Sequence, residues 1–387
     1  MKKVLLRGAT VITMDSPTFV GDVLMEDGKI AALGENLSTG GAEVYELSGM
    51  FVMPGLVDAH SHVGLSHSGT RDKDHNERTH PIQPHMRTID GIDPTDVAFE
   101  EARSGGVTTS VVCPGSVNLL GGVCSAIKSR GSTVEKMLLR DGIAMKAALG
   151  ENPKFCEPAN KAYPVSRMGI AAKIRETIVG AQNYKRQLEI AEKTGGFVPR
   201  DLAKEAMIPV IERKMPLKIH CHTHSDIITA IRICNEFDLR YTLDHCTEGG
   251  FVAGELVEAE KKNCEGVIIG PFGIYKGKLE AARRPGYEFG RTLYDAGVKF
   301  AIMTDFFETQ PERLITQAAL NAAEGLPDEE ALKAVTIHAA EICGIADRVG
   351  SLTVGKDADV AVFSHYPLES KARCMLTFID GELVYKR

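Results

Sequence analysis

The sequence lacks the features that mark membrane, nucleic-acid-binding and dinucleotide-binding proteins. No window approaches about eighteen consecutive apolar residues, so no membrane span is expected. No basic run stands out, and the formal net charge is −7, which argues against a nucleic-acid partner. No glycine-rich dinucleotide fingerprint follows the first strand-like segment. We therefore expect a small-molecule substrate, with neither a membrane nor a nucleic acid among the partners.

Paired cysteines are also missing. The nine cysteines occur singly and no CxxC spacing is present, so we expect reduced thiols rather than a disulfide framework. The first residues, MKKVLLRGATVITMDS, start with basic side chains, but Arg7 and Asp15 interrupt the apolar stretch and no small-residue cleavage site follows. This segment therefore predicts a β-strand and not a signal peptide. Both observations favour a cytoplasmic protein.

The two ends of the chain share a pattern of short strands and turns. Residues 1–54 contain the hairpin signal EDGK, and residues 346–387 contain a second one, IDGE. We expect these two ends to form the halves of one small β-sandwich domain. Residues 55–345 would then form a separate domain between them, for which a chain of 387 residues is long enough.

The middle of the chain alternates between apolar, β-branched runs and helical patterns. The runs are GVTTSVVCPG (106–115), GIAMKAALG (142–150), MPLKIHCH (215–222), LRYTLDHC (239–246), EGVIIGP (265–271) and VKFAIMTD (298–305). Such alternation indicates a parallel sheet covered by helices. With FVMPGLVDAH at the start and a weak strand near 123–128, the number of units is about eight, which predicts an α/β fold of the (β/α)8 TIM-like barrel type. An open doubly wound sheet is the alternative.

Histidine, lysine and carboxylate side chains lie at the ends of these predicted strands. They are His60 and His62 in GLVDAHSHVG, Lys146 and Glu151 in GIAMKAALGE, His220 and His222, His245, and Asp305. The carboxyl ends of all strands in a parallel barrel open on one face, so these residues would meet there. Residues i and i+2 of a strand point to the same side, so His60 and His62 can bind one cation. Imidazole with carboxylate ligation suits Zn²⁺, and also Fe²⁺, Mn²⁺ or Ni²⁺.

Each of these features also has a purely structural interpretation. A single HxH pair or a histidine at a strand end is often an ordinary hydrogen-bonded polar residue. An aspartate that ends a strand often caps the next helix, and Lys146 could simply pair with Glu151. The joint pattern over several strands is much harder to explain without a metal, so we predict a metal site.

Three segments resemble the metal-dependent amidohydrolase superfamily: GLVDAHSHVG, GVTTSVVCPG and VTIHAAEICGIADRVGSLTVGKDADVAVF. The nearest branch is imidazolonepropionase-like, because MKAALGENPK and KIHCHTHSD are similar to segments of its third and fifth barrel strands. The resemblance implies one or two divalent ions, with zinc as the expected metal. The ligands that it implies are His60, His62, His220, His245 and Asp305.

The resemblance leaves the bridging ligand open. Lys146 aligns with a carboxylated lysine of several branches, and Glu151 aligns with a bridging glutamate of others. Glu151 needs no modification and is favoured. The segment that contains Asp305, TDFFETQPE, lacks the His-Pro pair that follows this aspartate in many members, so any role of that histidine is absent.

The activity that the resemblance implies is hydrolysis of a C–N bond in an amide or cyclic amide, such as that of an N-acyl amino acid or a dipeptide. Asp305 would act as the general base toward a water that the metal acidifies. His222 would polarise the substrate carbonyl, or support a metal ligand by a hydrogen bond. A deaminase acting on an aminated ring is the alternative, and a catalytically silent scaffold is a third interpretation.

Substrate recognition is expected from two polar loops. Residues 65–92 form a long segment with three arginines and four histidines. These histidines are His67, His75, His80 and His85, and residues 274–286 supply Lys276, Arg283 and Arg284. Guanidinium groups held in place there would favour a substrate carboxylate. A solvated loop or a subunit interface explains the same composition, and a homo-oligomer is expected.

Overall fold

The predicted barrel is present as one eight-stranded sheet. The computed structural model describes residues 3–66, 73–154, 163–273 and 286–387. The strands lie side by side in chain order. They are β6 (Leu56–Ser61), β7 (Val107–Val112), β8 (Leu120–Lys128), β9 (Leu138–Ala148), β10 (Leu217–Cys221), β11 (Tyr241–His245), β12 (Cys264–Ile269) and β13 (Phe300–Ile302). The backbone N–H of Asp305 donates to the carbonyl of His60 over 3.1 Å, which joins the two edges of the sheet at the end where the strands finish.

One strand departs from the all-parallel arrangement that the sequence predicts. The weak strand near 123–128 exists, but β8 runs antiparallel to both β7 and β9. The connection from β7 to β8 contains only residues 113–119, and a parallel crossover needs about a dozen residues or more. The chain therefore turns back directly, and the remaining strands keep the parallel pairing.

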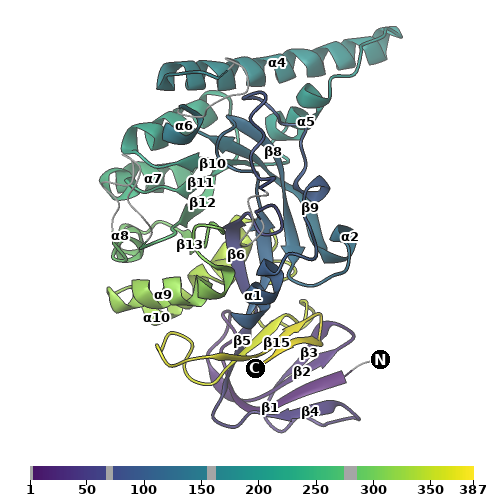
Figure 1. Ribbon diagram of the computed structural model, residues 1–387, viewed down its shortest axis with the longest axis vertical. Helices are drawn as coiled ribbons and strands as arrows, with labels where there is room; N and C mark the ends of the chain where they lie inside the picture. Colours follow the sequence, from purple (N-terminus) through teal and green to yellow (C-terminus); the bar gives the residue numbers. More distant parts are fainter. Residues whose placement is uncertain (1–2, 67–72, 155–162, 274–285) are drawn as a thin grey trace.

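Helices cover the outside of the barrel sheet (Figure 1). The α-helices are α1 (Ala98–Ser104), α2 (Val134–Met137), α3 (Glu151–Lys154), α4 (Arg167–Thr194), α5 (Leu202–Ile211), α6 (His224–Glu236), α7 (Ala253–Glu260), α8 (Phe289–Ala296), α9 (Leu314–Ala323), α10 (Asp328–Ala334) and α11 (Ile337–Ile342). Short 3₁₀ turns occupy Thr88–Asp90, Gly249–Val252 and Pro311–Arg313. Among the described residues, no helix combines the length and the apolar character that a membrane crossing requires.

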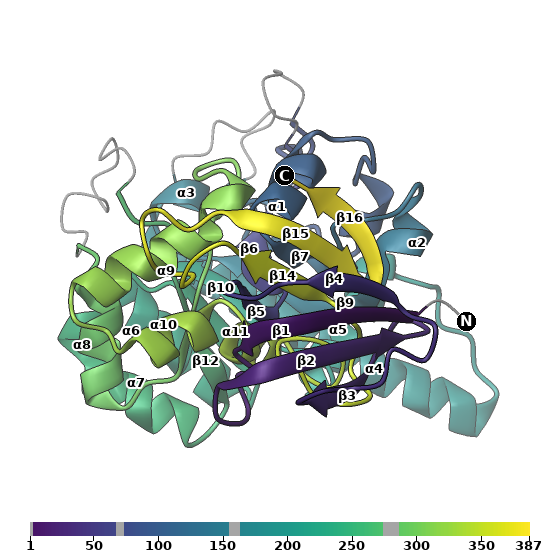
Figure 2. The ribbon, with the colours of Figure 1, turned by 90° about the horizontal axis from the view of Figure 1, so that it is seen from below.

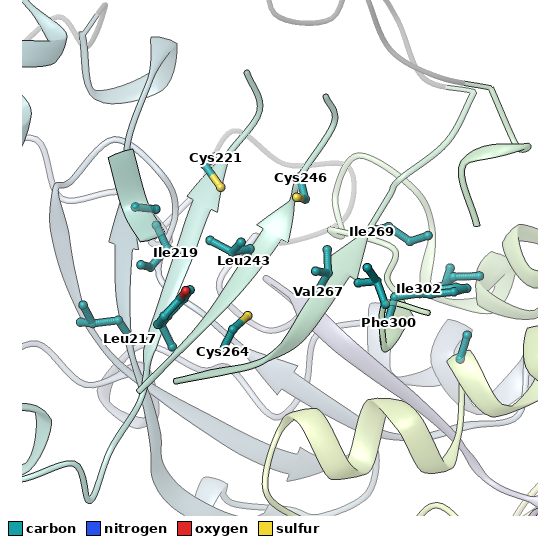
Figure 3. Close-up of a cluster of buried hydrophobic side chains, with 14 of the residues drawn as sticks. Leu217, Ile219, Cys221, Leu243, Cys246, Cys264, Val267, Ile269, Phe300 and Ile302 are labelled. Carbon is teal, nitrogen blue, oxygen red and sulfur yellow. The ribbon is translucent and has the colours of Figure 1, made fainter. Parts of the chain in front are cut away.

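Strand alternation decides which side chains face the helices and which face the barrel interior. On β10, Leu217, Ile219 and Cys221 belong to the cluster that packs between strands and helices (Figure 3). Successive side chains of a strand point to opposite faces. Lys218 and His220 therefore point to the other side, into the barrel, although both are almost fully buried.

The two ends of the chain form a separate sheet below the barrel, as predicted (Figures 1 and 2). Its strands are β1 (Lys3–Val11), β2 (Phe19–Glu26), β3 (Lys29–Gly34), β4 (Glu43–Glu46), β5 (Phe51–Pro54), β14 (Val360–Phe363), β15 (Cys374–Ile379) and β16 (Glu382–Lys386). Strand β14 pairs with β5, so the C-terminal hairpin continues the N-terminal strands. Both predicted hairpins are present, and Asp27–Gly28 and Asp380–Gly381 adopt the positive φ values that two-residue turns of this type need.

A buried ion cluster joins this sheet to the barrel. Lys128 ends β8, and its Nζ lies 2.7 Å from Asp357 Oδ2 and 3.1 Å from Asp359 Oδ1. The same ammonium contacts Asp380. Burial raises the pKa of Asp359 to about 6, so this carboxyl depends on the ammonium to stay ionised at neutral pH.

Lys128→Met is expected to lower the free energy of unfolding by about 3–5 kcal/mol, because it leaves the buried carboxylate of Asp359 without its ammonium partner. Urea denaturation followed by circular dichroism measures the loss. Lys29→Met is the matched control: Lys29 also contacts Asp357, at 2.6 Å, but its side chain is 46% exposed, so a loss of about 1 kcal/mol or less is expected. Equal losses in the two variants would contradict the buried role of Lys128.

Candidate metal centre

The ends of β6 and β13 bring together a first group of possible metal ligands. His60, His62 and Asp305 each offer a ligand atom within 4.8 Å of the others. Asp305 Oδ1 lies 3.5 Å from His60 Nε2 and 3.3 Å from His62 Nε2. The backbone of Asp305 adopts a positive φ of 49°, a conformation that costs free energy outside glycine and concentrates at functional sites.

The neighbouring strands β10 and β11 supply a second group. His220, His222 and His245 also lie within 4.8 Å of one another by their ligand atoms. Their ring centroids are 4.4–4.6 Å apart. Asp244 and His245 are consecutive and would point to opposite faces of a regular strand, but His245 has a positive φ of 65°. This turn of the backbone lets both side chains reach the interior.

The two groups are parts of one centre. The rings of His60 and His245 are 5.8 Å apart. Asp305 contacts the first group through Oδ1, and its Oδ2 lies 4.0 Å from His245 Nε2. Asp305 is therefore the side chain that lies next to both groups.

Backbone carbonyls fix the ring orientation of two of the histidines. Cys113 O lies 2.7 Å from His62 Nδ1, and Gly270 O lies 2.9 Å from His245 Nδ1. A carbonyl oxygen only accepts, so each Nδ1 carries the hydrogen and each Nε2 keeps its lone pair. Within the described part of the chain, the buried Nε2 of His245 has no hydrogen-bond partner. A divalent metal is the group that such lone pairs suit, so this donor set fits the predicted ion.

Burial and neighbouring groups put these side chains in the protonation states that metal binding requires. Burial lowers the pKa of His245 to about 3, so the ring is neutral at neutral pH. Burial alone would raise the pKa of Asp305, but the contact with His62 and the nearby His245 and His60 lower it by more, and the pKa lies well below its usual value. A neutral imidazole and an ionised carboxylate are the ligand forms of these residues.

The two candidates for the bridging position lie on different elements of the fold. Lys146 lies on β9, is fully buried, and places Nζ 3.2 Å from His60 Nε2. Glu151 begins α3, is half-buried, and belongs to neither ligand group. Lys146 therefore has a direct contact with a histidine of the first group.

Comparison with known proteins agrees with this geometry. A model of the amidohydrolase family matches residues 51–384. The chain belongs to the amidohydrolase family. An amidohydrolase from Thermotoga maritima has a solved structure that superposes with a TM-score of 0.95, at 39% sequence identity over 99% of this chain and 100% of that one.

Curated amidohydrolase relatives are more distant in sequence. Amidohydrolase tasK of Hapsidospora irregularis is 28% identical over 94% of this chain, which spans only 40% of the length of that protein. An imidazolonepropionase of Brevibacillus brevis is also 28% identical, over 89% of this chain and 83% of the relative. The match to an imidazolonepropionase agrees with the branch that the sequence resembles.

In the described part of the loop that follows β6, His75 approaches the amidohydrolase centre. His75 is buried, its ring stacks on His62 with centroids 5.2 Å apart, and Ser66 Oγ lies 2.6 Å from its Nδ1. His80 and His85 are exposed. Arg87 pairs with Asp141 over 2.5 Å, so its charge is already balanced. His67, Lys276, Arg283 and Arg284 lie outside the described residues.

Several supporting groups could not be recognised in the sequence. Ser116 Oγ lies 2.9 Å from His220 Nδ1, and Thr247 Oγ1 lies 2.7 Å from His222 Nδ1. Serine and threonine are common in loops, and the carbonyls of Cys113 and Gly270 leave no sequence signal at all. Asp244 also supports the centre, because its Oδ2 lies 2.5 Å from His60 Nδ1. Its position next to His245, at the end of a predicted strand, is a signal that the sequence does contain.

Proposed function

We propose that this amidohydrolase is a metal-dependent hydrolase that cleaves the C–N bond of an amide or cyclic amide, with zinc as the metal. The observation that supports it most is the position of Asp305, whose two carboxylate oxygens face the two histidine groups. A carboxylate there can orient a water molecule and exchange a proton with it next to the ligands.

The metal would be held by the residues of the two ligand groups, and His222 belongs to the second group together with His220 and His245. Its ring lies 4.5 Å from that of His245, which favours a ligand role over the carbonyl-polarising role suggested by the sequence. A divalent metal held here supplies Lewis acidity, which acidifies water and polarises a carbonyl.

Asp305 carries the proton in this mechanism. Its low pKa keeps the carboxylate ionised at neutral pH, so it can accept a hydrogen bond from water. Because this carboxylate is a weak base, it could take a proton only from a water molecule whose pKa the metal has lowered. Asp305 then returns the proton to the nitrogen that leaves, which converts a poor leaving group into a neutral amine.

We also propose that Lys146, rather than Glu151, provides the bridging ligand as a carbamate. Its neutral amine would attack carbon dioxide, form an N–C bond and release one proton. The 3.2 Å contact with His60 Nε2 supports this role, because a carbamate on Lys146 would then lie near the ligands of the first group.

Lys146→Ala is expected to lower activity about 100-fold or more, since changes near metal ligands already cost 10–100-fold in metal affinity. Formate or acetate should restore part of the activity, because a short carboxylate can occupy the space that the side chain leaves. Glu151→Gln, the control, should retain activity. Loss of activity in Glu151→Gln, with Lys146→Ala still active, would assign the bridge to Glu151.

A panel of N-acyl amino acids, dipeptides, cyclic amides and aminated rings tests the function directly. The metal-loaded protein should release a free amine and a carboxylate from members of the first three classes. Ammonia released only from aminated rings would identify a deaminase instead. No turnover of any class by protein with full metal content would contradict the proposal.

A further inference from the structure

A buried lysine–aspartate pair lies below the metal centre and has no part in the mechanism above. Lys218 Nζ lies 3.1 Å from Asp244 Oδ2 and 3.3 Å from Asp244 Oδ1. Both side chains are 0–2% exposed. Thr242 Oγ1 donates to the same carboxylate, to Oδ1, over 3.1 Å. The register of β10 and β11 places Lys218 opposite Thr242 and His220 opposite Asp244, so the pair is built into two adjacent strands.

This carboxylate supports one histidine of the centre and not the others. Asp244 Oδ2, the atom nearest Lys218, lies 2.5 Å from His60 Nδ1. The Nδ1 atoms of the other four histidines face uncharged groups: the hydroxyls of Ser116 and Thr247, and the carbonyls of Cys113 and Gly270. A carboxylate behind an imidazole makes it a stronger metal ligand than a neutral acceptor does.

A buried carboxylate needs a compensating charge to keep this position. Desolvation opposes an isolated charge in the interior, and an ammonium at hydrogen-bond distance offsets that cost. Lys218 contacts both oxygens of Asp244, so it also fixes the rotation of the carboxylate. The oxygen shared with His60 is thereby held within hydrogen-bond distance of the Nδ1 atom.

We infer that Lys218 is a positioning residue that acts through Asp244 on His60, and that it sets the metal affinity of the group formed by His60, His62 and Asp305. The inference rests on the proposed metal-binding function. The affinity of this group would then depend on a charge two residues before His220, on a strand that supplies a ligand to the other group.

Metal titration of Lys218→Met tests the inference without any substrate. Methionine keeps most of the length of the lysine side chain and lacks its charge. Metal-free protein is titrated with Zn²⁺ against a chromophoric chelator, and with Co²⁺ followed by visible absorption. Lys218→Met should weaken binding of the ion held by His60, His62 and Asp305 roughly 10–100-fold, the usual effect of losing a group that supports a ligand. Thr242→Val, the control, removes only a neutral hydrogen bond to Asp244 and should change the affinity less than about threefold.

A double-mutant cycle separates positioning from a general effect on the fold. In a His60→Ala background, Lys218→Met should no longer change the affinity for the ion that remains bound, because the residue through which it acts is gone. An equal loss in that background would overturn the inference. If Lys218→Met does not fold, Lys218→Met/Asp244→Asn removes both charges together and should still bind metal roughly 10-fold more weakly. Parent-like affinity in a folded double variant would likewise overturn it. A protein that shows these affinity changes but hydrolyses no amide would refute the proposed reaction and leave this inference standing.

Discussion

Asp305→Asn is expected to lower kcat roughly 10²–10⁴-fold, the contribution of general acid–base catalysis. The amide keeps the size of the carboxylate and an oxygen that can ligate weakly, so the fold and much of the metal should remain. It cannot accept a proton from water and return it at neutral pH. The loss should fall on kcat more than on KM, because substrate binding does not depend on the proton transfer. Steady-state kinetics at saturating metal, with metal content measured on the same samples, gives both quantities.

Asp58→Asn is the matched control for this experiment. Asp58 is a fully buried carboxyl on β6, and its Oδ1 accepts a hydrogen bond from the backbone N–H of Thr304 over 3.1 Å. Burial raises its pKa to about 7, so a neutral amide replaces a group that is only partly ionised at neutral pH. A kcat within about threefold of the parent is expected, since no acid–base step is lost. If Asp305→Asn behaves in the same way, another group carries the proton.

His60→Ala combined with His62→Ala is expected to remove at least one metal ion per chain and to abolish turnover. The double change takes away two of the three ligand atoms of the first group. The remaining carboxylate of Asp305, even with the proposed Lys146 carbamate, offers too few ligands to hold the ion, because these ions take four or more ligands. Elemental analysis of protein purified with excess metal measures the loss.

His80→Ala with His85→Ala provides the control for that loss. Both histidines are exposed, and neither belongs to a ligand group among the described residues. The control should keep the parent metal content and activity. Full metal occupancy in His60→Ala/His62→Ala would show that these two histidines are not ligands.

Much of the architecture could be predicted from local patterns. Continuous apolar, β-branched runs followed by helical patterns indicated the barrel, because strands buried on both faces are continuously apolar. The hairpin signals EDGK and IDGE indicated strand pairs at both ends of the chain, since Asp-Gly tolerates the positive φ values of tight turns. The HxH pair at the end of a strand indicated a metal, because side chains two residues apart share a face.

The tertiary structure alone decided how those residues meet. Lys146 and Glu151 are only five positions apart in the sequence. Lys146 lies on β9 and contacts His60, whereas Glu151 begins α3 and belongs to neither ligand group. The antiparallel course of β8 was missed, although the segment between the predicted strands at 106–115 and 123–128 is already too short for a parallel crossover. The positive φ of His245 interrupts the alternation of side chains along β11, so its ring faces the same interior as the side chain of Asp244.

The sequence by itself determined the fold class, the family resemblance and the types of side chain available as ligands, because these depend on periodicity and on short motifs. It could not determine which Nδ1 atoms face a carbonyl, a hydroxyl or a carboxylate. Those contacts join residues between 25 and 184 positions apart, and they form only when separate strands close around a common interior. The support of His60 by Asp244 and Lys218 could not be predicted from the sequence either, because its geometry arises from the register between β10 and β11.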